Sequence, residues 1–287
     1  MLKSIYFLPH GMQMIDGLEQ PYNENFRSLH EMMQQISNEI ESDGSDMVLL
    51  VTPHGYNLSN KYLIYQHDEF QGYLYSVSDD DVVKGNLVSK HSWIGDSARS
   101  IELLNILEEN NIPVESLVQG FSSYPLVLAW GEVVPLYYAL AKQDAKVVIL
   151  CVPRSRLEII LDMQTHLKKI GELLQHFCNL VDEKVSIIIS GDLSHVHKED
   201  GPYGFDESAK IFDAKFCDWV NQPQPDSYLE ILDLQPKALA CGMAGIGILQ
   251  GLFDRIKGNG SSIKNDINYY DVPTYFGMGI AKWIIID

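Results

Sequence analysis

The sequence is poor in basic residues. Its 21 lysines and arginines stand against 39 aspartates and glutamates, which gives a formal net charge of −18. Such a chain cannot neutralise a row of phosphates, so nucleic acid is excluded as a partner, and anionic membrane surfaces are disfavoured for the same reason. No apolar run approaches the roughly 20 residues that a membrane-spanning helix needs. The charge leaves small ligands and divalent cations as partners.

Cysteine is also scarce, with four residues in 287. These cysteines form no CxxC pair and have no compact disulfide spacing, so we expect reduced thiols. The apolar run within residues 1–9 is too short for a signal peptide. Together these features predict a cytoplasmic protein without a membrane segment.

The chain shows no internal repeat and no low-complexity linker, which predicts a single domain over residues 1–287. Four short apolar runs are continuous rather than alternating, a pattern typical of strands buried on both faces. They cover residues 5–8, 47–51, 147–152 and 185–190. Two further strands are expected at 62–77, with a turn at 70–72, and at 275–286.

Longer segments between these runs have the apolar spacing of helices. Phe26, Leu29, Met33, Ile36 and Ile40 recur at intervals of three and four, which indicates an amphipathic helix. Further helices are predicted at 97–110, 132–142, 154–181, 207–220 and 239–256, and a flexible connection at 257–262. Strands that alternate with helices predict an α/β fold, with a central mixed, mostly parallel sheet flanked by helices.

Three of the predicted strands run directly into a loop that carries a histidine. His10 and His54 each stand in a Pro-His-Gly loop, and His195 ends a Gly-Asp-Leu-Ser-His segment. Ligands of open α/β sheets bind outside the carboxyl ends of the strands, where such loops converge. Proline makes the approach rigid and glycine lets the backbone turn away, so the imidazole is aimed at the crevice.

Taken alone, each of these histidines is interpreted equally well as a polar residue that merely ends a strand. The repeated loop favours a shared metal site instead, because imidazole is the commonest protein ligand for zinc, iron and copper. His197 is expected to be solvated. Glu132 is expected to favour the start of a helix, and Asp192 to hold a turn or to orient a histidine.

The two Pro-His-Gly loops, the Gly-Asp-Leu-Ser-His segment and the glycine-rich segment 241–247 together resemble the LigB superfamily. This superfamily contains the class III extradiol ring-cleavage dioxygenases and the related Memo proteins, and the resemblance spans nearly the whole chain. It implies a LigB-like domain over residues 1–287. It also implies that His10 and His54 bind a metal, Fe(II) in the dioxygenases, and that His195 is the catalytic acid–base residue.

The sequence departs from the dioxygenase pattern at two positions. The predicted helix 239–256 has no glutamate to complete the metal site; Cys241 is similar to the Memo pattern, in which a cysteine joins the histidines. A thiolate favours zinc or copper(I) over the usual Fe(II) centre. Cys241 is equally interpreted as a small buried hydrophobe, which leaves Glu132 or Asp192 as third ligand. At the second position, Trp130 stands where the family has a histidine.

The resemblance therefore implies a metal-dependent, extradiol-dioxygenase-like enzyme that acts on a small catechol or phenolic compound, with iron as its metal. Two other functions stay open. One is a Memo-like metal-binding protein, redox-active or regulatory, without ring-cleaving activity. The other is a zinc hydrolase on the same scaffold, because a histidine-bound metal suits hydrolysis. By analogy with the superfamily, we expect a homodimer.

Overall fold

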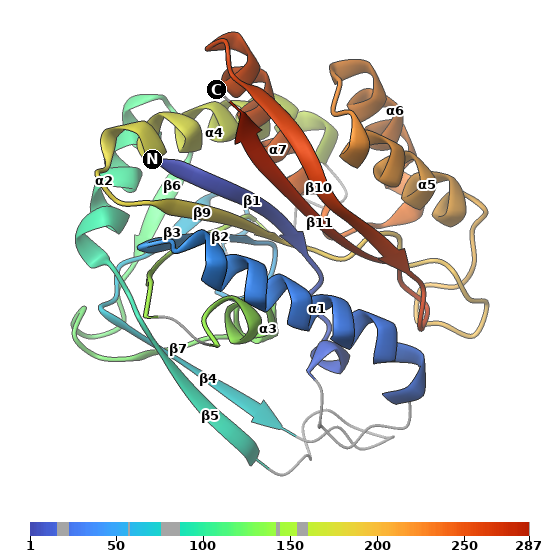
Figure 1. Ribbon diagram of the computed structural model, residues 1–287, viewed down its shortest axis with the longest axis horizontal. Helices are drawn as coiled ribbons and strands as arrows, with labels where there is room; N and C mark the ends of the chain where they lie inside the picture. Colours follow the sequence, from blue (N-terminus) through green and yellow to red (C-terminus); the bar gives the residue numbers. More distant parts are fainter. Residues whose placement is uncertain (16–22, 57, 76–86, 142–143, 154–159, 287) are drawn as a thin grey trace.

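The central sheet of the computed structural model has eight strands in the order β10-β11-β1-β9-β2-β8-β3-β6 (Figure 1). The structure describes residues 1–15, 23–56, 58–75, 87–141, 144–153 and 160–286. The eight strands are β1 Leu2–Leu8, β2 Met47–Thr52, β3 Tyr62–Tyr65, β6 Val114–Leu117, β8 Lys146–Cys151, β9 Val185–Ser190, β10 Ser262–Asp271 and β11 Met278–Ile286.

The four middle strands, β1, β9, β2 and β8, are mutually parallel. They are the four continuous apolar runs of the sequence, and their side chains are almost all buried because both faces of the sheet are covered. The outer strands β10, β11 and β3 make the antiparallel pairs. The predicted mixed, mostly parallel sheet is confirmed.

Helices cover both faces of this sheet in a single-domain α/β fold (Figure 1). The seven α-helices among the described residues are α1 Asn23–Asp43, α2 Ser97–Glu109, α3 Trp130–Ala139, α4 Ile160–Leu180, α5 Ser208–Asn221, α6 Pro225–Ala238 and α7 Met243–Gly258. The helices α1 and α3 pack on one face, and α2, α4, α5, α6 and α7 enclose the core of the other. No helix in the described part of the chain is long and apolar enough to cross a membrane.

A three-stranded sheet, in the order β5-β4-β7, adds to the layer of α1 and α3. Its strands are β4 Glu69–Tyr75, β5 Leu87–Ile94 and β7 Leu126–Val127. The turn predicted at 70–72 is wrong, because these residues lie inside β4 and pair with β5 and β7. The chain instead leaves the large sheet after Tyr65 and enters the small one at Glu69. Residues 76 and 77 of the predicted strand lie outside the described residues.

The C-terminal third differs most from the prediction. Helix α6 was not predicted, and the helix expected from residue 239 begins only at Met243, so residues 239–242 form a turn between α6 and α7. The flexible connection predicted at 257–262 is also wrong at both ends, since Gly258 closes α7 and Ser262 opens β10. The other helices are found with shifted ends; residues 154–159 of one and 142 of another lie outside the described residues.

Candidate metal centre

The site lies where three adjacent parallel strands end. Because β1, β9 and β2 are neighbours in this order, the loops that follow them meet at one edge of the sheet. The backbone N–H of Gly191 donates to the carbonyl of Leu8 at 2.9 Å, which joins the first two loops directly. Topology alone therefore brings together histidines that are far apart in the sequence.

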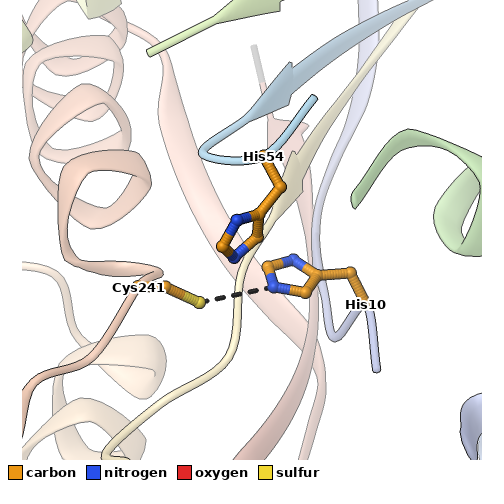
Figure 2. Close-up of side chains that lie close together, drawn as sticks. All are labelled: His10, His54 and Cys241. Atoms are coloured by element: carbon orange, nitrogen blue, oxygen red, sulfur yellow. Dashed lines mark hydrogen bonds between the residues drawn. The ribbon is translucent and has the colours of Figure 1, made fainter. Parts of the chain in front are cut away.

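Two imidazoles and a thiol point toward one another there (Figure 2). The ligand atoms of His10, His54 and Cys241 all lie within 4.8 Å of one another. His10 Nε2 is 3.4 Å from Cys241 Sγ, and the rings of His10 and His54 are perpendicular with their centroids 4.6 Å apart. A second group, formed by Asp192, His195 and Cys241, satisfies the same limit and shares the sulfur.

Cys241 reaches this position from the turn between α6 and α7, not from the helix in which it was expected. The turn is docked on the loop after β9: Gly242 N–H donates to the Asp192 carbonyl at 2.9 Å, and Asp192 N–H to Cys241 Sγ at 3.2 Å. The two loops touch so closely that a Cβ on Gly191 would lie 2.5 Å from the Cα of Gly242. Glycine is therefore required at this contact.

His10 is buried, and burial together with nearby His195 lowers its pKa to about 3. Its Nδ1 lies 2.8 Å from Ser190 Oγ, while Nε2 faces Cys241 and the Asp192 carboxylate, 3.4 Å away. The imidazole is thus neutral near pH 7, the form in which histidine binds metals.

Asp192 supplies a carboxylate to the cluster. It is buried, and burial raises its pKa to about 6, although His195 and the backbone N–H of His10 oppose this shift. The carboxylate accepts from His10 N–H at 3.2 Å and lies 3.4 Å from His10 Nε2, contacts that suit the predicted histidine-orienting role. The N–H of Ser194, in the loop of Asp192 itself, donates to Asp213. The structure also places the carboxylate close enough to Cys241 to serve as a ligand.

His195 lies at the rim of the cluster among aromatic rings. Its ring centroid is 5.5 Å from that of Tyr203 and 5.8 Å from that of Phe276. Burial lowers the pKa of His195, and the charge of Asp192 partly opposes the shift. The imidazole is therefore free to accept a proton near neutral pH.

One expectation for a residue near the site is wrong, and the helix-start role expected of Glu132 is confirmed. His197 is not solvated: its side chain is 5% exposed, and its Nε2 lies 2.6 Å from the buried carboxylate of Asp213. Among the residues that the structure describes, Glu132 belongs to neither ligand group. Its carboxyl group accepts from Tyr65 Oη at 2.9 Å and from Ala129 N–H at 3.0 Å, so it fixes the start of α3, as expected from the sequence.

The donor set fits a transition metal. Imidazole nitrogen, thiol sulfur and carboxylate oxygen converge at one buried point, and this mixture suits zinc, iron or copper rather than magnesium or calcium. Lone pairs that face one another repel unless a proton or a cation lies between them. The residues of this site are therefore chemically suited to hold a metal ion.

Comparisons with known proteins bear on the family and the fold of this chain. The family model "Catalytic LigB subunit of aromatic ring-opening dioxygenase" matches residues 4–278. A relative from Clostridium acetobutylicum, "Protein CA_C1420", is 22% identical over 98% of this chain, which spans 57% of that relative's length. A solved structure, "uncharacterized protein JW3007 from Escherichia coli K12", matches 98% of this chain and 99% of that one with a TM-score of 0.58 and 14% identity, which supports the fold alone.

Proposed function

This chain belongs to the LigB family of catalytic subunits of aromatic ring-opening dioxygenases, and we propose that it is a metal-dependent enzyme that opens the ring of a small catechol or phenolic compound. Enzymes of this family generally use a divalent metal. The observation that carries the proposal is the convergence of His10, His54 and Cys241 beside His195 at the strand ends.

His10, His54 and Cys241 would hold the metal, which is Fe(II) if the protein is a dioxygenase and zinc or copper otherwise. A metal bound there would hold the substrate hydroxyl oxygens and lower their pKa. Asp192 is the alternative third ligand. In either arrangement the protein keeps the metal away from bulk water, because His10, Cys241 and Asp192 are buried.

His195 is proposed to accept a proton from the substrate hydroxyl and to return it when the ring opens. Its lowered pKa keeps the imidazole neutral before the reaction, as a base must be. The exposed rings of Trp130 and Tyr203 pack at a tilt against His54 and His195 respectively, and they offer flat apolar surfaces beside the cluster. Such surfaces favour an aromatic substrate.

The test is oxygen consumption by protein purified without a metal-affinity tag, loaded anaerobically with Fe(II) and offered a panel of catechols. We expect consumption with at least one catechol. His195→Gln should lower that rate about 10² to 10⁴-fold without loss of iron. His176→Gln, on the exposed side of α4, is the matched control and should change neither. Iron-loaded protein that consumes no oxygen with any catechol would contradict the proposal.

A second candidate is a Memo-like metal-binding protein, redox-active or regulatory, without ring-cleaving activity. Cys241 favours it, because its thiol lies beside His10 and His54, as the resemblance to the Memo pattern implies, and the segment 239–256 has no glutamate. Metal analysis of the protein as isolated distinguishes the candidates. Iron supports the dioxygenase, copper supports the Memo-like protein, and zinc supports a hydrolase or a protein without catalysis.

A further inference from the structure

Ser190, the last residue of β9, bridges two elements of the site. Its side chain is buried, and its hydroxyl oxygen has two partners. The carbonyl oxygen of Gly131 lies 2.7 Å away, and His10 Nδ1 lies 2.8 Å away. The serine thus connects the first turn of α3 with a proposed metal ligand.

The chemistry of the partners fixes the direction of both hydrogen bonds. A carbonyl oxygen only accepts, so the single hydroxyl hydrogen of Ser190 is donated to Gly131. The serine oxygen then accepts from His10, which requires the ring proton to be on Nδ1. His10 Nε2 is therefore the nitrogen with the lone pair, and it is the nitrogen that faces Cys241 and Asp192.

Pro135 explains why the Gly131 carbonyl accepts this bond. In an α-helix the carbonyl of residue 131 accepts from the N–H of residue 135. Residue 135 is a proline inside α3 and has no N–H. The helix therefore leaves one buried carbonyl without its usual donor, and the hydroxyl of Ser190 supplies the missing hydrogen.

The same turn of α3 also lies against the second histidine. A Cβ on Gly131 would approach His54 Cβ to 2.6 Å, and the Trp130 ring lies on the His54 ring at 5.2 Å. Glycine at position 131 thus lets the helix come close enough for its carbonyl to reach Ser190. This contact sets where the carbonyl stands relative to both imidazoles.

We infer that Ser190 is a positioning residue for His10. Together with the Gly131 carbonyl, which Pro135 leaves without a helical donor, it fixes the His10 ring so that Nε2 is directed at Cys241 and Asp192. The role of Ser190 in metal binding rests on the proposed metal site, whereas its two hydrogen bonds do not. Both hydrogen bonds join groups of the protein alone, so they are testable in metal-free protein. Failure of ring cleavage or of metal binding would leave that test intact.

The first measurement is the ¹⁵N NMR spectrum of the histidine rings in metal-free wild-type protein. We expect His10 as the Nδ1–H tautomer, assigned by comparison with His10→Gln. In Ser190→Ala the acceptor is lost, and we expect a mixture of tautomers. Pro135→Ala restores a competing N–H in α3 and should shift His10 toward the same mixture even if Ser190→Ala does not fold. A wild-type His10 with its proton on Nε2 would overturn the inference.

The second measurement is the affinity for Zn(II) of the same variants. Ser190→Ala should bind it about 10 to 100-fold more weakly, the usual effect of removing a partner of a metal-bound histidine. Ser186→Ala is the matched control, because Ser186 is equally buried in β9 and its hydroxyl contacts only Ser4 and Ser45 among the described residues. It should bind like wild type. Equal affinities for the two variants would contradict a role in positioning.

Discussion

Two histidines separated by one residue in the chain have opposite environments. His195 faces Cys241 and Asp192 of the proposed metal site, and it is surrounded by aromatic rings. Asp192 is its charged neighbour. His197 faces away, toward Asp213 of α5, whose buried carboxylate also accepts from Tyr270 Oη at 2.7 Å and from Ser194 N–H at 3.0 Å. The chain bends at His195, which separates the two side chains.

A histidine with a carboxylate partner is therefore not by itself a functional site. The carboxylate of Asp213 has three donors, so it and His197 form a satisfied structural network that holds the loop after β9. Around His195, by contrast, the carboxylate of Asp192 and the thiol of Cys241 converge with the imidazole, and the same thiol also belongs to the group of His10 and His54. The convergence of several potential metal ligands distinguishes the second environment from the first.

The largest effect is expected from breaking the structural network. Asp213→Ala leaves Ser194 N–H, Tyr270 Oη and His197 without their acceptor, and each buried group left unsatisfied costs about 1–3 kcal/mol of stability. His10, His54 and Cys241 do not contact Asp213 in the described structure, so metal affinity should stay near that of wild type. Urea unfolding and a metal titration measure the two effects. A large loss of affinity with unchanged stability would reverse the assignment of the two environments.

The converse effect is expected at the cluster. His10→Ala combined with His54→Ala removes two of the proposed ligands and should weaken metal binding by more than about 100-fold, beyond the usual cost of changing a ligand's partner. Circular dichroism should show the fold retained, because the strands that carry both loops are buried independently of them. The matched control is His197→Gln, which should keep the metal. Full metal occupancy in the double variant would remove the shared site.

The third expected effect concerns Glu132, a carboxyl beside the cluster but outside it, and it takes the form of a dependence of stability on pH. Burial raises its pKa to about 8, above its ordinary 4.5. The unfolded chain releases this proton near pH 4.5 and the folded chain retains it to about pH 8, so the wild type loses up to about 1.4 kcal/mol per pH unit between these values.

Glu132→Gln keeps one donor and one acceptor and does not titrate. The difference in unfolding free energy between the variant and wild type should therefore grow in favour of the variant from pH 5 to 8 and level off above pH 8. Urea unfolding at each pH measures this difference. Glu108→Gln, on the exposed face of α2, should show no such trend. A gap that shrinks as pH rises would mean that Glu132 is ionised in the folded protein.

Much of the fold follows from local patterns. Strands β1, β2, β8 and β9 are recognisable in the sequence as continuous apolar runs, because a strand buried on both faces needs apolar residues at every position. The histidines that follow three of these strands are recognisable for the same reason. Strand β10 was missed because it is an edge strand with alternating half-exposed residues. Helix α6 was not predicted because it contains two prolines, which usually indicate the absence of a helix. Pro225 stands at the first turn, where the missing N–H has no cost, and Pro236 stands near the end of the helix.

The site was less predictable, since its contacts join distant segments. Cys241 was expected in a helix, but the left-handed backbone at Leu239 ends α6 and turns the chain so that the thiol reaches Asp192. The link from Gly131 through Ser190 to His10 spans 59 and 180 residues, and no local pattern indicates it. Pro135 carried a signal, because a proline within a helix implies a carbonyl that needs another donor.

The most direct test of the metal centre is a Co(II) titration of the metal-free protein followed by visible and near-ultraviolet absorption. If His10, His54 and Cys241 hold the ion, the wild type should bind about one equivalent and show a sulfur-to-cobalt charge-transfer band. Cys241→Ser should lose that band and bind more weakly, because a hydroxyl replaces a thiolate poorly toward soft metals. An unchanged affinity in Cys241→Ser, with no charge-transfer band in the wild type, would exclude the thiol from the site and contradict the account.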